Sequence, residues 1–228
     1  MKVSLKSIIG PAFYDVHKHI KNNDYTHYWL KGGRGSLKSS FIGTEIPLGI
    51  MRDAQKGLMS NAVVIRRVKD TLRGSVYEQI KWAIYMMKVE NEWEMPDSKL
   101  QMTYKPTGQV IIFKGADNPK KLKSTKVFVG YIKYVWFEEC DEFESHDKIT
   151  NINQGELWAA LCLCTALVLP PGSPWLHEPA LLYPGLSLAA VVPAAWAVWW
   201  VVVPPPPLPP EQLLQPVQRQ SLAALCGT

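Results

Sequence analysis

Cysteine is scarce in this sequence, with four among 228 residues, and only Cys140 lies in the first 155 positions. A single residue separates Cys162 from Cys164, and no His or Cys pair follows at the spacing of a zinc site. This usage argues against a zinc module and fits a reducing compartment. The amino-terminal MKVSLKSIIG becomes polar too early for a secretory signal peptide, so we expect a cytoplasmic protein.

The last 73 residues lack whole residue types, and this divides the chain into two parts. Residues 156–228 contain no Lys, Ile, Asn, Asp, Phe or Met, but hold 13 of the 18 prolines and five of the nine tryptophans. Their one base and three acids give a net charge of −2, whereas the 24 bases and 17 acids of residues 1–155 give +7. The sequence therefore excludes one homogeneous domain, and it predicts a domain over 1–155 with a tail over 156–228.

The first part alternates between short apolar runs and longer stretches with a helical spacing of apolar residues. Pro47 should bend or break the first of the expected helices. Such an alternation predicts βαβ units and an α/β domain with a mainly parallel sheet. We expect strands at 25–31, 61–68 and 132–138, helices at 37–54 and 71–89, and a hairpin formed by 100–104 and 109–114.

The most informative motif is a glycine-rich turn between the first expected strand and the first expected helix. Its glycines let backbone N–H groups turn inward around an anion, and the following helix N-terminus adds partial positive charge. In a phosphate-binding loop of the pattern G-x-x-x-x-G-K-S, Lys38 would reach the β- and γ-phosphates of ATP, and the Ser39 hydroxyl would bind Mg²⁺. The predicted ATP-binding residues are Gly32, Gly33, Arg34, Gly35, Ser36, Leu37, Lys38 and Ser39.

One residue departs from this pattern, because Leu37 stands where the second glycine of the loop is expected. A side chain at that position resists a positive φ, at a cost of about 1–2 kcal/mol. Taken alone, the same residues could be a glycine-rich turn ahead of a basic helix start.

A second motif, YVWFEE at 134–139, begins about 95 residues after the loop. Its four apolar residues predict a buried strand, with two acids at the carboxyl end, where open α/β sheets bind their ligands. Glu138 would hold Mg²⁺, and Glu139 would orient and deprotonate the attacking water. A strand that ends in acids often leads only into a solvated loop, so the catalytic interpretation depends on the tandem acids and on the preceding loop.

Arginines near the loop are candidates for contacting the γ-phosphate during phosphoryl transfer. Arg34 lies inside the loop, and Arg66, Arg67 and Arg73 follow the second expected strand. Each could act in cis or from a neighbouring subunit, or could face solvent or DNA phosphate.

Two further groups of basic residues have simpler interpretations. The lysines of 120–126 form either a loop that contacts a polyanion or a solvated loop. His17 and His19 are expected at the surface rather than as metal ligands. The lysines of the 120–126 loop are Lys120, Lys121, Lys123 and Lys126.

Four segments together resemble the ATPase domain of the large terminase subunits of tailed phages and prophages, of the PBSX type. The resemblance runs from about residue 13 to residue 154, in order and at plausible spacing. It implies a P-loop NTPase fold of the additional-strand catalytic-glutamate type, α/β, with a mainly parallel sheet and helices on both faces. The segments are YWLKGGRGSLKSSF at 28–41, VVIRRVKDTLRGSV at 63–76, IIFKGADNPKKLKS at 111–124 and YVWFEECDEF at 134–143.

The resemblance also implies a function, the ATP-driven packaging of double-stranded DNA into a procapsid. By this resemblance Lys38 and Ser39 would contact phosphate and Mg²⁺. Glu138 would be the Walker B acid, in place of the Asp common in P-loop enzymes, and Glu139 the catalytic glutamate. Arg34 is a catalytic candidate because of its position inside the loop. The implied partners are double-stranded DNA, a small terminase subunit and the portal of the procapsid, with subunits arranged as a homo-oligomeric ring in the host cytoplasm.

Some parts of such terminases are not recognisable in this sequence. Residues 156–228 contain no Asp, so we expect no RNase H-like nuclease domain with its Asp-held metals. The segment that couples hydrolysis to DNA movement is also not recognisable, so we expect ATP binding with poor turnover. The rival hypothesis is a non-hydrolytic module that binds nucleic acid or is anchored in a membrane. A P-loop kinase or helicase would need a substrate lid or helicase motifs, and neither is recognisable.

The tail allows three interpretations. Residues 186–203 carry no charge over 18 positions, near the lower limit for a membrane-spanning helix, although Pro193 interrupts them. The proline-rich runs could instead form polyproline II segments that dock a partner. We favour a third hypothesis, a frameshift or a chimeric gene assembly, because the composition changes where the resemblance stops.

Overall fold

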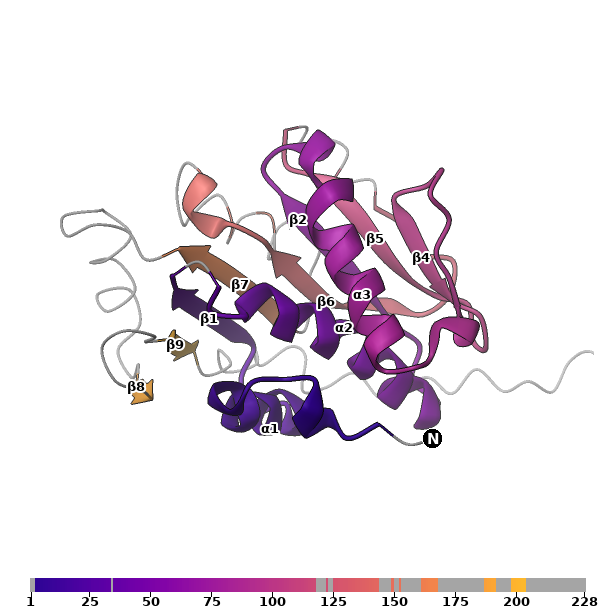
Figure 1. Ribbon diagram of the computed structural model, residues 1–228. Helices are drawn as coiled ribbons and strands as arrows, with labels where there is room; N and C mark the ends of the chain where they lie inside the picture. The colour runs from indigo at the N-terminus through magenta and orange to yellow at the C-terminus, as the bar shows by residue number, and fades with distance from the viewer. Residues whose placement is uncertain are drawn as a thin grey trace, which may run out of the picture.

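A nine-stranded β-sheet runs through the molecule in the order β3-β4-β5-β2-β6-β7-β1-β9-β8 (Figure 1). The computed structural model describes residues 3–33, 35–117, 122, 125–143, 149, 152, 161–167, 187–191 and 198–203. Its helices are α1 (Tyr14–Asn22), α2 (Lys38–Gln55) and α3 (Glu78–Met86). Its strands are β1 (His27–Gly32), β2 (Ser60–Arg66), β3 (Trp93–Glu94), β4 (Gln101–Tyr104), β5 (Gln109–Gly115), β6 (Tyr131–Phe137), β7 (Leu161–Leu167), β8 (Ser187–Val191) and β9 (Val198–Val203).

The middle of the sheet is parallel, as the alternation of strands and helices predicted. Strands β5, β2, β6, β7 and β1 pair in parallel, in that order. The remaining pairs, β3 with β4, β4 with β5, β1 with β9 and β8 with β9, are antiparallel. Because the carboxyl ends of the five parallel strands meet at one edge, that edge is where a ligand is expected.

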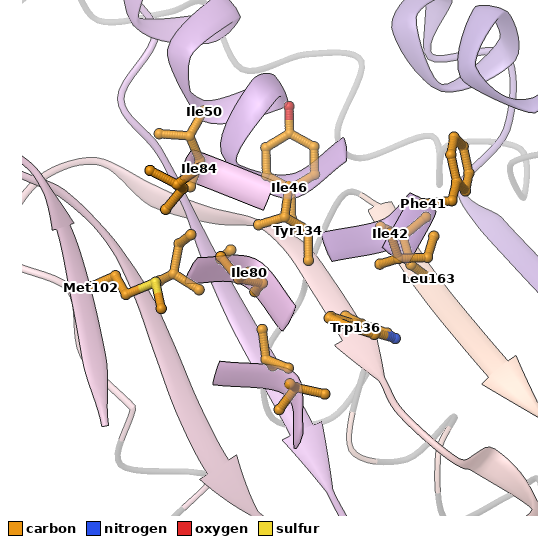
Figure 2. Close-up of a cluster of buried hydrophobic side chains, with 14 of the residues drawn as sticks. Phe41, Ile42, Ile46, Ile50, Ile80, Ile84, Met102, Tyr134, Trp136 and Leu163 are labelled. Atoms are coloured by element: carbon orange, nitrogen blue, oxygen red, sulfur yellow. The ribbon is translucent and has the colours of Figure 1, made fainter. Parts of the chain in front are cut away.

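The two faces of the sheet carry separate hydrophobic clusters, because successive side chains of a strand point to opposite faces. In β6, Tyr134 and Trp136 join the cluster that contains the buried side chains of α1, α2 and α3. Val135 and Phe137 join the cluster on the other face. Figure 2 shows helix side chains such as Ile42 and Ile80 over the first face of the sheet. On the other face the described cover comes from shorter pieces: Ala116, Leu122, Cys140, Phe143, Ile149 and Ile152.

The helices differ from the sequence prediction in two places. Of the bend or break expected at Pro47, the break does not occur. The helix α2 continues through this buried residue to Gln55. The helix expected over 71–89 consists of a π-helical turn, Arg73–Tyr77, followed by the α-helical Glu78–Met86. Apolar spacing is similar in both kinds of turn, so it does not distinguish them.

A strand from beyond position 155 completes the parallel core. Leu161–Leu167 forms β7, which pairs in parallel with β6 on one side and with β1 on the other. The sheet therefore continues across the change in composition. Of the run considered as a membrane helix, residues 187–191 and 198–203 are the antiparallel strands β8 and β9. Within the described ranges no helix has the length and apolar character to span a membrane.

The rest of the tail, with all 13 of its prolines and the segments considered for polyproline II, lies outside the described residues. The hypothesis of a frameshift or chimeric assembly stays a prediction.

A buried polar network holds the edge of the sheet opposite the nucleotide motifs. The Asp53 carboxylate, near the end of α2, accepts hydrogen bonds from Ser60 Oγ at 2.8 Å and from Tyr134 Oη at 2.7 Å. Lys133 Nζ lies 3.0 Å from the same carboxylate. Burial by itself raises the pKa of Asp53, but the bonds from Tyr134, Lys133 and Ser60 outweigh it and hold the pKa below its usual value. The network thus ties α2 to β2 and β6.

The close approach of α2 to β6 requires glycine at position 49. A Cβ added to Gly49 would lie 2.6 Å from Tyr134 Oη. We expect Gly49→Ala to lower the free energy of unfolding by about 1–3 kcal/mol, because Tyr134 must move and weaken its bond to Asp53. Urea unfolding of the full chain measures this. Gly74→Ala is the matched control, since an added Cβ there meets nothing within 4 Å. Equal stability of the two variants would contradict the packing described here.

The lowered pKa of Asp53 predicts a pH dependence of stability. A carboxyl group with a depressed pKa stabilises the fold above its unfolded value of about 4, and this contribution is lost as the pH falls through the folded pKa. We therefore expect the difference in unfolding free energy between the wild type and Asp53→Asn to be constant above about pH 5 and to shrink toward pH 2. Urea midpoints at a series of pH values check this, with the exposed Asp15→Asn for comparison. A difference that is independent of pH would count against the prediction.

Candidate active site

The predicted nucleotide residues meet at the carboxyl edge of the parallel strands. A cavity of about 240 Å³ lies between the loop after β1 and the ends of β6 and β7. It combines both predicted motifs with two residues that the sequence analysis did not select, Ser40 and Thr165. The lining residues are Gly33, Gly35, Ser36, Leu37, Lys38, Ser39, Ser40, Glu138, Glu139 and Thr165.

The loop between β1 and α2 adopts the strained backbone that its sequence suggested. Gly35 has φ 74°, and Leu37, directly before the first residue of α2, has φ 62° and ψ 14°. The leucine side chain is 56% exposed. Leu37 therefore occupies the left-handed region that favours glycine, the conformation that its side chain was expected to resist. Arg34 lies outside the described residues.

Lys38 begins α2, and its side chain turns back onto the loop. Its Nζ donates to the carbonyl oxygens of Gly32 at 2.7 Å and Gly33 at 3.1 Å, and to Ser36 Oγ at 2.8 Å. Burial lowers the pKa of Lys38, and the negative charges of Glu138 and Asp141 oppose that shift. The ammonium group thus lies inside the ring of loop atoms, where it can exchange these acceptors for anionic oxygens.

Glu138 follows the last residue of β6 and is held by two hydroxyl groups. Ser39 Oγ donates to its Oε1 at 2.8 Å, and Thr165 Oγ1 of β7 donates to its Oε2 at 2.5 Å. Burial raises the pKa of Glu138, while the bonds from Thr165 and Ser39 and the charges of Arg66 and Lys38 act in the opposite direction. A buried carboxylate with its charge disfavoured in this way is a good acceptor for a cation.

Glu139 points to a different partner from its neighbour. Its backbone is left-handed, with φ 53° and ψ 57°, and this turns successive side chains apart. The Glu139 carboxylate forms an ion pair with Arg66 at the end of β2. Arg66 is thereby brought beside both acids, whereas the sequence alone could not separate it from the other arginines.

The remaining predicted basic residues lie elsewhere or are not described. Arg67 is exposed, and the Arg73 guanidinium lies over the Tyr77 ring at 5.5 Å. Lys126 is exposed. His17, expected at the surface, pairs with buried Glu45, and His19 pairs with Asp24. Lys120, Lys121 and Lys123 fall outside the described residues.

Thr165 is a residue of the candidate site that sequence reasoning missed. Besides its bond to Glu138, its Oγ1 receives a hydrogen bond from Trp136 Nε1 at 3.3 Å. A signal was present, since Thr165 carries the one hydroxyl group in the apolar run LCLCTAL at 161–167. The hydroxyl group reaches Glu138 because β7 pairs with β6, and the local sequence does not show this pairing.

The donors present fit a small hard cation. Ser39 and Glu138 offer oxygen atoms 2.8 Å apart next to the loop, and oxygen ligands are those that Mg²⁺ prefers. Among the described residues no cluster of three or more His, Cys, Asp or Glu side chains could hold a metal ion by itself. A cation here would therefore take part of its coordination from a ligand such as phosphate.

Comparison with known proteins identifies the family. Residues 24–155 match the phage terminase large subunit family. The chain is 37% identical over 171 residues to the terminase large subunit of Bacillus phage SPP1, which covers 75% of this chain and 37% of that protein. It is 35% identical over 134 residues to the PBSX phage terminase large subunit of Bacillus subtilis strain 168, covering 59% and 28%. The chain thus spans about a third of the length of these curated relatives.

Solved structures share the fold. The large terminase of bacteriophage HK97 superposes with a TM-score of 0.52 at 14% identity, covering 69% of this chain and 33% of that one. The ATPase domain of the Thermus phage P74-26 large terminase superposes with a TM-score of 0.50 at 15% identity, covering 78% and 74%. The described fold is therefore that of a terminase ATPase domain, and the chain belongs to the phage terminase large subunit family.

Proposed function

We propose that this chain binds ATP with Mg²⁺ and hydrolyses it, as part of a motor that packages viral DNA. The observation that carries the proposal is the hydrogen bond between Ser39 at the start of α2 and Glu138 at the end of β6. It joins the two predicted motifs at the mouth of one cavity, with Glu139 beside them. This arrangement supports a nucleotide-hydrolysing domain better than it supports a module that only binds nucleic acid or a membrane.

Phosphate binding would use the loop backbone and Lys38. The N–H groups at the start of α2 and the helix dipole favour an anion, and the ammonium group of Lys38 would exchange its carbonyl acceptors for β- and γ-phosphate oxygens. Ser39 and Glu138 would hold Mg²⁺, which when bound neutralises the charge that develops on the phosphates. Arg34 is proposed as a further positive group of the loop.

Hydrolysis would depend on Glu139. Its carboxylate would orient a water molecule and accept its proton as the water oxygen attacks the γ-phosphorus. The bond between the γ-phosphorus and the β–γ bridging oxygen would break at the same time, so that ADP leaves with that oxygen and inorganic phosphate is formed. In the described structure this carboxylate is paired with Arg66, so the pair must loosen before Glu139 can act as the base. Arg66 lies beside both acids. Its positive charge would then stabilise the negative charge that develops on the γ-phosphate.

The proposed ATPase unit includes β7 and so extends beyond the expected boundary at residue 155. Thr165 supplies the second hydrogen bond to Glu138, and β7 separates β1 from β6 in the sheet. We assign Thr165 the role of holding the Glu138 carboxylate in the orientation that faces Ser39.

The family suggests the wider setting of this activity. We propose that hydrolysis drives double-stranded DNA through a homo-oligomeric ring in the host cytoplasm. The partners would be a small terminase subunit and the portal of a procapsid. These assignments concern the whole terminase, of which this chain covers a part.

Replacing the two central charged residues should separate binding from hydrolysis. Lys38→Ala should weaken nucleotide binding, because the phosphates lose their buried cation. Glu139→Gln should leave binding largely intact but reduce turnover about 100-fold or more, because the base is lost. Calorimetric binding of ADP with Mg²⁺ and phosphate release from ATP measure the two effects. Exposed Lys18→Ala and Glu142→Gln are matched controls, and turnover that neither test variant changes would refute the site assignment.

Removing the Thr165 hydroxyl should weaken the magnesium site without changing the shape of the core. We expect Thr165→Val to raise the Mg²⁺ concentration for half-maximal turnover and to lower turnover about tenfold, because Glu138 loses one donor. Thr165→Ser keeps the hydroxyl and should retain most of the activity. Magnesium titrations of ATP hydrolysis check this. Identical titrations for the valine and serine variants would remove Thr165 from the site.

A further inference from the structure

The amino-terminal segment lies along the same helix that begins at the phosphate-binding loop. Residues 10–17, here named the strap, comprise Gly10, the 3-10 turn Pro11–Phe13 and the first turn of α1. None of the residues proposed for ATP binding or hydrolysis belongs to the strap.

The strap contacts α2 at two positions four residues apart, and it passes close to the loop residue that precedes the helix. A Cβ added to Gly10 would lie 3.7 Å from Leu37 Cδ1. The Phe13 and Phe41 rings stack, with their centroids 4.5 Å apart and their planes 10° from parallel. Further along, His17 and Glu45 form an ion pair. Phe41 and Glu45 lie four residues apart on one face of α2, and Leu37 directly precedes this helix, so the strap follows the chain from the loop through the first two turns of α2.

The last of these contacts is polar and largely buried. His17 Nδ1 lies 2.5 Å from Glu45 Oε1, and the Glu45 side chain is 1% exposed. Its other oxygen, Oε2, has no hydrogen-bond partner among the described residues. A buried carboxylate with a single partner is strongly tied to that partner, because losing it would leave the charge uncompensated. His17 and Glu45 therefore set where α1 lies along α2.

The position of α2 matters for phosphate binding because its first residues form the anion site. Leu37 holds a strained left-handed backbone directly before Lys38, and its Cδ1 atom lies near Gly10. A shift of the first turn would move Lys38 and the N–H groups that would face phosphate. Small displacements of such positioned groups have large effects on binding and catalysis.

We propose that residues 10–17 act as a strap that couples nucleotide binding to the docking of α1, with His17 and Glu45 as its positioning residues. The proposal rests on the proposed function, since it assumes that the loop binds nucleotide. Coupling is reciprocal: the docked strap favours nucleotide binding, and bound nucleotide favours the docked strap.

The first test measures the affinity of the full chain for ADP with Mg²⁺ by calorimetry. His17→Ala should raise the dissociation constant about fivefold, and Phe13→Leu should change it in the same direction. Glu45→Gln keeps a hydrogen-bond acceptor for His17 and should stay within about twofold of the wild type. His19→Ala is the matched control, because His19 pairs with Asp24, which follows α1.

The second test follows hydrogen exchange of the α1 amides, residues 14–22. ADP with Mg²⁺ should slow their exchange in the wild type and not in His17→Ala. If His17→Ala and Phe13→Leu lower the urea midpoint but leave the dissociation constant unchanged, the strap is only structural and the proposal is overturned. If the wild type binds ADP no better than Lys38→Ala, the proposed function fails, and the strap proposal falls with it.

Discussion

The buried carboxylate of Glu138 is the interaction on which the nucleotide site depends. Ser39 and Thr165, which lie 99 and 27 positions away in the sequence, both donate hydrogen bonds to it. Because burial disfavours its charge, the carboxylate needs these donors, and they in turn fix the start of α2 and the end of β7 around the end of β6. One side chain thereby brings the phosphate-binding loop, the two acids and strand β7 into one site.

A second buried carboxylate holds the opposite end of the same strand. Asp53 binds Lys133 and Tyr134 of β6, so α2 and β6 are joined by polar contacts at both ends, with apolar packing between them (Figure 2). Such an arrangement leaves α2 little freedom to slide along the sheet. The strap on a further face of α2 adds a third restraint, close to the residues proposed to bind phosphate.

Much of the fold was predictable because it depends on local signals. The β-branched run before Arg66 and the apolar run before Glu138 are strands, as expected, and the glycine-rich turn joins β1 to α2. The prediction of a break at Pro47 was less successful. Pro47 does not end α2, since the packing of this helix on the sheet outweighs one missing backbone hydrogen bond. The π-helical turn at Arg73–Tyr77 leaves no signal in the apolar spacing.

By itself, the sequence determined the mainly parallel α/β architecture and singled out the loop residues and the two acids as candidates for the site. Both depend on periodicity and motif spacing, which act over short stretches of chain. Tertiary structure alone decided which arginine meets Glu139, that Thr165 bonds Glu138, and that His17 faces Glu45. Each of these pairs joins segments distant in sequence. Their meeting depends on the order of strands in the sheet and on how the helices pack over it, and no local pattern encodes either.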